Sequence, residues 1–340
     1  GEVQTVVQSG TVATTLRVTA TDVETQISTQ SGVLTISTGI PHQSAFSMSL
    51  DTCNTNTFEF DGYTVPVNVI LSDRFQNPVP DGTAITFTAE GGQIVNGCVT
   101  DGGGCSVNWT SADPRPGVLS NDQPNQFGGR VTILATAIGE ESFIDEDGDF
   151  VYDAGEVFGD LEERFRDDNE DGDFDIGVDG LFLDFNESGT QDAADGTFNG
   201  LLCSSGCSPT EILGVSAEAV LVMGTSGSIL TPSVNPVVVG LEGQGTVNLL
   251  VSVTDENGNF PPAGTVIKVT TVTAGAVVGP SEYTVPDSCG IAPQPFVAVF
   301  AFEGGPVPES GSIFVEATTP APNPVTTAVM YGVVVQDMAP

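Results

Sequence analysis

The chain has 340 residues, which is enough for two or three domains, and its hydrophobic content of 39% is enough for buried cores. Its 45 Asp and Glu against 7 Lys and Arg give a formal net charge of −38, which repels phosphate backbones and excludes nucleic acid as a partner. The sequence shows no signal peptide and no apolar run long enough to span a membrane, so we interpret it as a mature, exported, soluble segment.

The pattern of side chains along the chain predicts strands and almost no helix. Short alternating segments rich in Val, Thr, Ile and Phe recur between turns of Gly, Pro, Asn and Asp. This spacing is typical of β-sandwiches.

Residues 1–40 contain what we interpret as the last two strands of a unit. Residues 16–21 resemble 130–137 and 312–318, and in each case a second apolar strand follows. Two strands alone expose an apolar face and unpaired edges. Two explanations stay open: the chain is a fragment of a longer protein with neighbouring domains, or these strands are added to a sheet of another copy, head to tail.

An internal repeat defines the two following units. Residues 69–87 match 251–269 at one constant spacing, so that Asp73 meets Asp255 and Asn77 meets Asn259. Each copy reads as a strand, a polar turn and a second strand. We therefore predict a middle sandwich over 41–226 and a C-terminal sandwich over 227–340.

An acidic insertion at 140–200, between the last two strands of the middle unit, contains three runs of oxygen-bearing residues. Each run places them at positions 1, 3, 5 and 9, and the residue at position 7 is expected to add its backbone carbonyl. The first and third runs also have a carboxylate at position 12. The first loop comprises Asp145, Asp147, Asp149, Val151, Asp153 and Glu156. The second comprises Asp167, Asn169, Asp171, Asp173 and Asp175, and the third Asp184, Asn186, Ser188, Thr190, Asp192 and Asp195. This is the ligand spacing of an EF-hand-type loop, so calcium is the predicted cofactor.

A solvated acidic linker is the alternative, because most charge runs are of that kind. Against it, the spacing occurs three times, and a phenylalanine precedes each loop by two residues (Phe143, Phe165, Phe182). The loops also depart from the EF-hand pattern. Position 6 of the first is Phe150, and position 12 of the second is Val178 with Asp179 one residue late. The segments between the loops are too short for flanking helices.

Six cysteines indicate an oxidising compartment. Cys98 and Cys105 flank a glycine-rich turn, and Cys203 and Cys207 enclose three residues, so both pairs are predicted to be local disulfides. Cys53 and Cys289 remain, and they either bridge two domains, bridge two subunits or stay free. Cysteine ligation of a metal is the alternative, although the sequence has no CxxC spacing.

The Asp/Asn–Pro–Gly-Thr pattern of the repeat resembles bacterial immunoglobulin-like repeats of the intimin and invasin type. Residues 104–116, 129–143 and 198–203 resemble large exported proteins of Gram-negative bacteria that carry such domains. The resemblance covers most of the chain. It implies tandem sandwiches, a location at the cell surface or outside the cell, and a calcium-loop insertion, without a catalytic activity.

The predicted fold is therefore all-β, with tandem immunoglobulin-like β-sandwiches and an irregular acidic calcium-binding insertion in the middle domain. No enzyme is expected, because the one histidine, His42, lies in an apparent linker. The predicted function is structural: a calcium-stabilised extracellular protein that forms an extended surface or filamentous assembly. An adhesin stalk or binding module for a glycan or receptor is the alternative.

Overall fold

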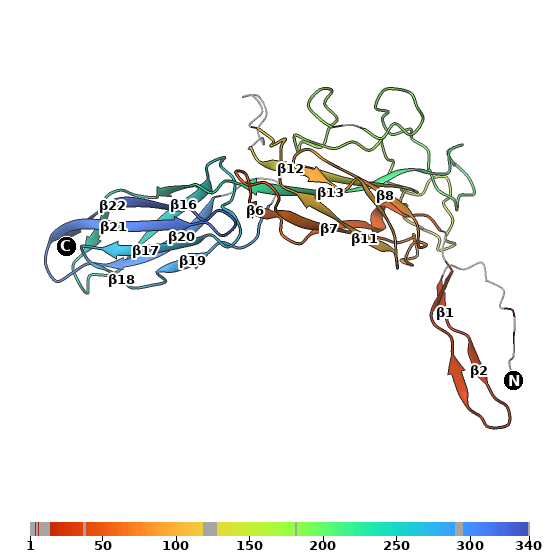
Figure 1. Cartoon of the computed structure of the whole chain (residues 1–340), viewed down its shortest axis with the longest axis horizontal. Coiled ribbons are helices and arrows are strands. Elements are labelled where there is room, and N and C mark those ends of the chain that lie inside the picture. The colour runs from red at the N-terminus through yellow and green to blue at the C-terminus, as the bar shows by residue number, and fades with distance from the viewer. Residues whose placement is uncertain are drawn as a thin grey trace.

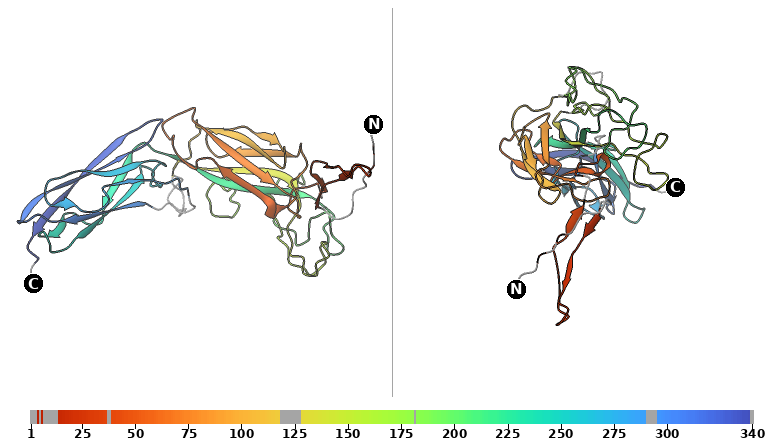
Figure 2. Two further views of the ribbon diagram at one scale, coloured as in Figure 1. Left: turned by 90° about the horizontal axis from the view of Figure 1, so that it is seen from below. Right: turned by 90° about the vertical axis from the view of Figure 1, so that its right-hand side faces the viewer.

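The computed structural model describes residues 4, 6, 14–36, 39–117, 128–180, 182–289 and 295–338. The protein is all-β, and an N-terminal hairpin is followed by two immunoglobulin-like β-sandwiches (Figure 1). The sandwiches lie end to end, and the hairpin projects from the end of the middle sandwich that is remote from the C-terminal one (Figure 2). The described chain is therefore elongated.

The N-terminal hairpin consists of two short antiparallel pairs. β1 (Thr14–Leu16) pairs with β4 (Leu34–Ile36), and β2 (Thr19–Thr21) pairs with β3 (Ser28–Gln30). All side chains of β2 and β3 are exposed. Parts of the predicted 1–40 unit, namely 1–3, 5, 7–13 and 37–38, lie outside the described residues.

The middle sandwich starts after a short 3-10 turn, η1 (Gln43–Ala45), and has two sheets. The first sheet contains, in spatial order, β5 (Phe46–Leu50), β7 (Thr64–Leu71), β11 (Gly104–Thr110) and β9 (Gln93–Ile94). The second contains β10 (Gly97–Val99), β8 (Ala84–Ala89), β12 (Arg130–Gly139), β13 (Leu213–Gly224) and β6 (Asn54–Asn56).

The C-terminal sandwich repeats this topology. Its first sheet contains β14 (Ser228–Pro232), β16 (Val247–Asp255), β20 (Phe296–Glu303) and β18 (Ala276–Val277). Its second contains β15 (Val237–Gly240), β22 (Thr326–Gln336), β21 (Glu309–Thr318), β17 (Val266–Val272) and β19 (Glu282–Thr284). In both sandwiches one short strand, β6 or β15, runs parallel to the last long strand.

Alternation of apolar residues along the strands builds one core per sandwich, since successive side chains point to opposite faces of a sheet. In β7, Val65, Val67 and Val69 are buried while the residues between them are not. Trp109 is fully buried in the same core, where its indole N–H donates to the Gly91 carbonyl at 2.8 Å. The tryptophan is therefore a core residue.

The repeated polar turn has the same structure in both sandwiches. The carboxylates of Asp73 and Asp255 are fully buried, and each accepts the backbone N–H of the asparagine four residues later. The Asn77 side chain donates to the carbonyl of Ile36 in the hairpin, and the Asn259 side chain donates to that of Gly128 in the middle sandwich. Each sandwich thus contacts the preceding unit through this turn.

The strand pairs of the hairpin can be aligned with the last two strands of each sandwich. Matching positions pair across the strands in all three copies. The pairs are Leu16 with Leu34, Val131 with Leu221, and Ile313 with Tyr331. In the sandwiches these side chains are almost completely buried, whereas Leu34 is 46% exposed.

The joint between the two sandwiches is polar and covalent. The Cys53–Cys289 disulfide crosses it, and the Asp287 carboxylate accepts the N–H groups of Cys53 and Asn54 at 3.0 and 2.9 Å. The buried Asn54 side chain donates to carbonyls of the C-terminal sandwich. The Asn56 side chain donates to the carbonyls of Pro320 and another residue of the β21–β22 turn. These contacts hold the two sandwiches together at several points.

Candidate metal centre

The acidic insertion leaves the middle sandwich after β12 and returns to it at β13. Its first residue, Glu140, is fully buried and donates its N–H to the Pro41 carbonyl at 2.9 Å, in the linker that follows the hairpin. In the C-terminal sandwich the same connection is the short β21–β22 turn, which contacts the middle sandwich. The insertion therefore extends a turn that faces the preceding unit.

Aromatic rings form a small core at the base of the insertion. Tyr152 and Phe198 stack with ring centroids 4.3 Å apart, and Phe143 and Phe158 pack against them edge-on. Tyr152 is 4% exposed and Phe198 is 1% exposed. A second row of rings, Phe165, Phe174 and Phe182, lies at the second loop. The phenylalanines that precede the loops thus pack on other rings of the insertion.

The backbone of the three loops turns in the same way. In each loop the residues at positions 4 and 6 have positive φ, a conformation that glycine adopts without strain. These residues are Gly148 (81°) and Phe150 (70°), Glu170 (57°) and Gly172 (87°), and Glu187 (59°) and Gly189 (80°). The first loop has its glycine at position 4 instead of position 6, and at position 6 Phe150 adopts the positive φ although it carries a large side chain. Its ring packs against Phe75 of the sandwich at 5.6 Å.

The first carboxylate of each loop caps the turn that follows it. Asp145, Asp167 and Asp184 each accept the N–H of position 6, at 3.0, 2.8 and 2.9 Å respectively. The side-chain oxygens at positions 3 and 5 also accept N–H groups from two residues further on. The side chains predicted as ligands at positions 1, 3 and 5 are therefore turned toward the inside of their own loops.

One carboxylate closes each loop by accepting the same two N–H groups, those of positions 2 and 9. In the first loop it is Glu156, which accepts from Glu146 and Asp153 at 2.8 and 2.9 Å. In the second it is Asp179, with distances of 3.0 and 2.6 Å. In the third it is Glu163, with distances of 2.9 and 3.1 Å.

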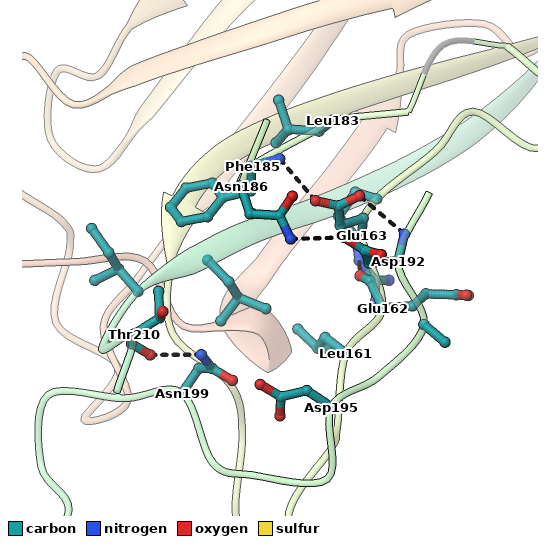
Figure 3. A pocket seen from close by; sticks show the side chains of 15 residues that line it. Leu161, Glu162, Glu163, Leu183, Phe185, Asn186, Asp192, Asp195, Asn199 and Thr210 are labelled. Carbon is teal, nitrogen blue, oxygen red and sulfur yellow. Dashed lines mark hydrogen bonds between the residues drawn. The ribbon is translucent and has the colours of Figure 1, made fainter. Parts of the chain in front are cut away.

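The third loop differs here from the prediction, which placed Asp195 at position 12. The Asp195 carboxylate accepts the N–H and hydroxyl of Thr197, whereas Glu163 comes from the segment before the second loop (Figure 3). Figure 3 shows Glu163 between Phe185 and Asp192, beside a cavity of about 140 Å³ that Asp195 also lines. A carboxylate outside the loop was not predicted, because spacing within a loop carries no information about it.

Further contacts of the predicted ligands differ from loop to loop. Asp179 lies one residue later than Glu156 does in its loop, and the structure accommodates this shift with a side chain that is shorter by one methylene. Asp153 of the first loop is hydrogen-bonded to the hydroxyls of Ser204 and Ser205. Asn169 and Asn186 each donate across their loop to the carboxylate at position 9, at 3.1 and 2.7 Å.

The donor set fits a hard divalent cation. In the first loop, oxygens of Asp145, Asp147 and Asp149 lie within 4.8 Å of one another. Burial raises the pKa of Asp167 and of Asp179 above the ordinary value, so that a nearby positive charge would stabilise their ionised forms. Calcium takes 6–8 oxygen ligands in flexible geometry, whereas thiolate and imidazole ligands, which softer metals prefer, do not belong to these loops.

Arginines attach the acidic insertion to the sandwich. Arg130 of β12 forms a buried ion pair with Glu170, at position 4 of the second loop. The guanidinium of Arg74, in the turn that begins with Asp73, lies 3.9 Å from the centre of the Phe143 ring and is attracted by Glu140 and Asp145. Both contacts join charges of the insertion to strands or turns of the core.

All six cysteines are paired. Cys98 joins Cys105 and Cys203 joins Cys207, which are the two local pairs that the spacing predicts. For Cys53 and Cys289 the structure selects one of the three alternatives, the bridge between two domains. None of the six is left to ligate a metal.

The single histidine lies where the chain enters the middle sandwich. His42 is 7% exposed, its Nδ1 is 2.9 Å from the Ser44 hydroxyl, and burial lowers its pKa to about 4. The ring is therefore neutral at physiological pH. No helix within the described ranges is long and apolar enough to cross a membrane.

Comparisons with known proteins add little beyond the architecture. No family model matches the chain, and no curated protein matches it. Among solved structures it is similar to the D0-D1 domain of intimin, with 12% identity, a TM-score of 0.22, and coverage of 84% of this chain and 96% of that one. The Yersinia pseudotuberculosis adhesin InvE gives 10% identity, a TM-score of 0.25, and coverage of 86% and 60%. An Escherichia coli alpha-2-macroglobulin has 11% sequence identity and a TM-score of 0.25, and the match covers 95% of this chain and 20% of that one. These values establish neither a family nor a function.

Proposed function

We propose that this chain is a structural, calcium-stabilised protein of the cell exterior that forms an extended surface or filamentous assembly. Three disulfides support an oxidising location outside the cytoplasm. An exported protein of a Gram-negative bacterium is the source that the sequence resemblance implies. Two sandwiches joined end to end support an extended role.

The observation that supports calcium binding is that each of the three loops is closed in the same way by one carboxylate. Glu156, Asp179 and Glu163 come from different positions in the sequence, yet each accepts the N–H groups of positions 2 and 9 of its loop. In an EF-hand loop the closing acid is the bidentate calcium ligand. We infer that these three carboxylates, with the oxygens at positions 1, 3 and 5, would hold the ions.

Calcium would supply positive charge where the chain concentrates acid. Close to half of the acidic residues of the chain lie in the insertion, and their mutual repulsion opposes its folding. Cation binding to the folded loops would stabilise them by mass action. The role of the metal is thus structural.

Titration calorimetry tests this. Calcium uptake is expected with dissociation constants on the order of 10⁻⁴–10⁻³ M for loops of extracellular type, and magnesium should substitute poorly. Asp147→Ala should weaken the first site, whereas Glu211→Ala, an equal loss of charge at an exposed residue outside the loops, should not. Absence of calcium uptake, or equal affinity for magnesium, would reject the proposal.

The assembly part rests on the N-terminal hairpin. Its apolar positions Leu16 and Leu34 match residues that are buried in both sandwiches, and Leu34 is 46% exposed. We infer that they are covered in the working protein by copies of itself added head to tail, or by neighbouring domains of a longer chain. Deleting 1–38 separates these cases. If copies cover them, the intact chain polymerises while the truncated chain stays folded and monomeric.

Electron microscopy with calcium and with a chelator completes the test. Ordered polymers that need calcium are expected. A chain that remains monomeric and binds a glycan or receptor saturably would instead support the adhesin alternative.

A further inference from the structure

The middle sandwich has an open groove at its side seam. The seam runs between β5 of one sheet and β13 of the other, and the groove has a volume of about 470 Å³. Met48, Leu50 and Val220 give it apolar walls. The second acidic loop borders it on one side, and the Cys53–Cys289 bridge borders it where the C-terminal sandwich begins. The groove is thus bordered by the two strands, the second acidic loop and the joint between the sandwiches.

Both strands beside the groove have an edge without a strand partner in the described chain. β5 pairs only with β7, and along 217–221 β13 pairs only with β12. The C-terminal sandwich bridges the same seam differently: there the Tyr331 hydroxyl donates to the Leu230 carbonyl at 3.1 Å. The matching residue of the middle sandwich is Leu221, which has no hydroxyl. Unpaired edges beside an apolar groove are suited to accept an extended segment.

The groove is also acidic, with four carboxylates around it. Glu170 is already paired with Arg130, Asp287 accepts N–H groups at the joint, and Asp167 caps the second loop. Glu218, which projects from β13 and is exposed, accepts the Asp167 N–H at 3.4 Å and also attracts the Arg164 and Arg166 guanidiniums. Arg166 is itself paired with Asp168, so the acids at the groove outnumber the arginines beside it. A segment that fits the groove should therefore carry a positive charge next to apolar side chains.

One segment of this chain has that composition, Leu16-Arg17-Val18 of the hairpin, in which Leu16 and Val18 are half-buried. Arg17 is exposed and makes no ion pair in the described chain. The other arginines are taken up by carboxylates or by the Phe143 ring, and Lys268 faces Glu282 and Glu316 in its sheet. In a molecule of net charge −38, a contact between two copies needs such a cation to overcome repulsion.

We propose that the groove between β5 and β13 accepts the N-terminal hairpin of a second copy, with Arg17 placed at Glu218. The inference rests on the proposed self-assembly and names its donor and acceptor surfaces. Donor and acceptor are different surfaces, so the contact is heterologous and continues from copy to copy. Because the groove lies near the joint and the hairpin at one end, successive copies would overlap along their length.

Charge reversal tests the proposal in calcium-containing buffer by sedimentation velocity over a range of concentrations. Arg17→Glu and Glu218→Arg should each raise the concentration needed for assembly by about tenfold or more, because each puts like charges together. Arg17→Lys should assemble like the wild type. Lys268→Glu and Glu242→Arg make the same changes of net charge elsewhere and serve as matched controls, with folding of every variant checked by circular dichroism.

Mixing the two reversed proteins is the decisive experiment. Within each reversed protein the hairpin and the groove carry like charges, which oppose assembly. In the mixture the hairpin of each protein can bind the groove of the other, which has the opposite charge, so assembly should return. Assembly of Arg17→Glu at the wild-type concentration, or no recovery in the mixture, would overturn the groove assignment and leave self-assembly standing. A wild-type chain that stays monomeric at all concentrations would overturn both.

Discussion

Glu163 is the residue that decides whether the third loop resembles the other two. Glu163→Gln should weaken the third calcium site by about tenfold or more, because it removes the charge of the closing carboxylate. Asp195→Asn removes a charge of the same sign from a carboxylate that caps Thr197 and should have little effect. Calorimetry on both variants checks this. A larger effect at Asp195 would mean that spacing within the loop identifies the ligand correctly.

Asp255 gives the C-terminal sandwich a dependence on pH. Burial raises its pKa from 3.8 to about 6, so the folded protein holds this proton more tightly than the unfolded chain does. The contribution of Asp255 to stability is therefore greatest below about pH 4 and is lost as the pH rises to about 6. Its loss can reach about 3 kcal/mol.

Asp255→Asn removes this titration. Thermal unfolding between pH 4 and 7, with chelator present so that calcium does not contribute, should show the variant gaining stability relative to the wild type as the pH rises. A difference between the two proteins that stays constant over this range would contradict the prediction.

At the scale of the element, the insertion has two parts that should respond differently to chelation. The base is held by the buried, stacked rings of Tyr152 and Phe198 and by the Cys203–Cys207 clip, whereas no described apolar residue of the second and third loops is fully buried. Mutual repulsion of the acids would by itself predict that all of 143–198 unfolds without a cation. With the structure, we expect the loops to unfold and the aromatic base to remain.

Hydrogen exchange with and without chelator measures this directly. Amides of 167–195 should lose protection, while those of Tyr152 and Ser204, which are hydrogen-bonded within the base, should keep it. Limited proteolysis should cut first within 145–195. A first cut within 245–270 would show that the C-terminal sandwich depends on the insertion.

The elements themselves were largely predictable from the sequence, and the contacts between distant segments were not. Alternation of apolar residues predicted the strands, and the match of Asp73 with Asp255 predicted two copies of one unit. The short cysteine spacings predicted two disulfides. By contrast, the partner of Cys53 and the role of Glu163 depend on segments brought together only by the fold, and no local pattern reports such distances.

For the whole molecule, the joint should stay rigid without its disulfide. Replacing Cys53 and Cys289 by Ser leaves the Asn54 and Asn56 side chains bonded to the C-terminal sandwich. Small-angle scattering of this variant should match the wild type. Adding Asn54→Ala and Asn56→Ala removes several buried hydrogen bonds, each costing about 1–3 kcal/mol when a partner is left unsatisfied. The combined variant should then show a broader distribution of shapes, and an unchanged profile would contradict this.

The position of the insertion between β12 and β13 has a mechanical consequence. Both strands lie inside a folded sheet, so a pull along the long axis does not stretch the loops between them. The Cys53–Cys289 disulfide also encloses 54–288, so tension between the two ends of the chain passes from Cys53 to Cys289 and bypasses the insertion even if the middle sandwich opens. The insertion is thus doubly shielded from mechanical load, and only reduction of this disulfide would place its loops under tension.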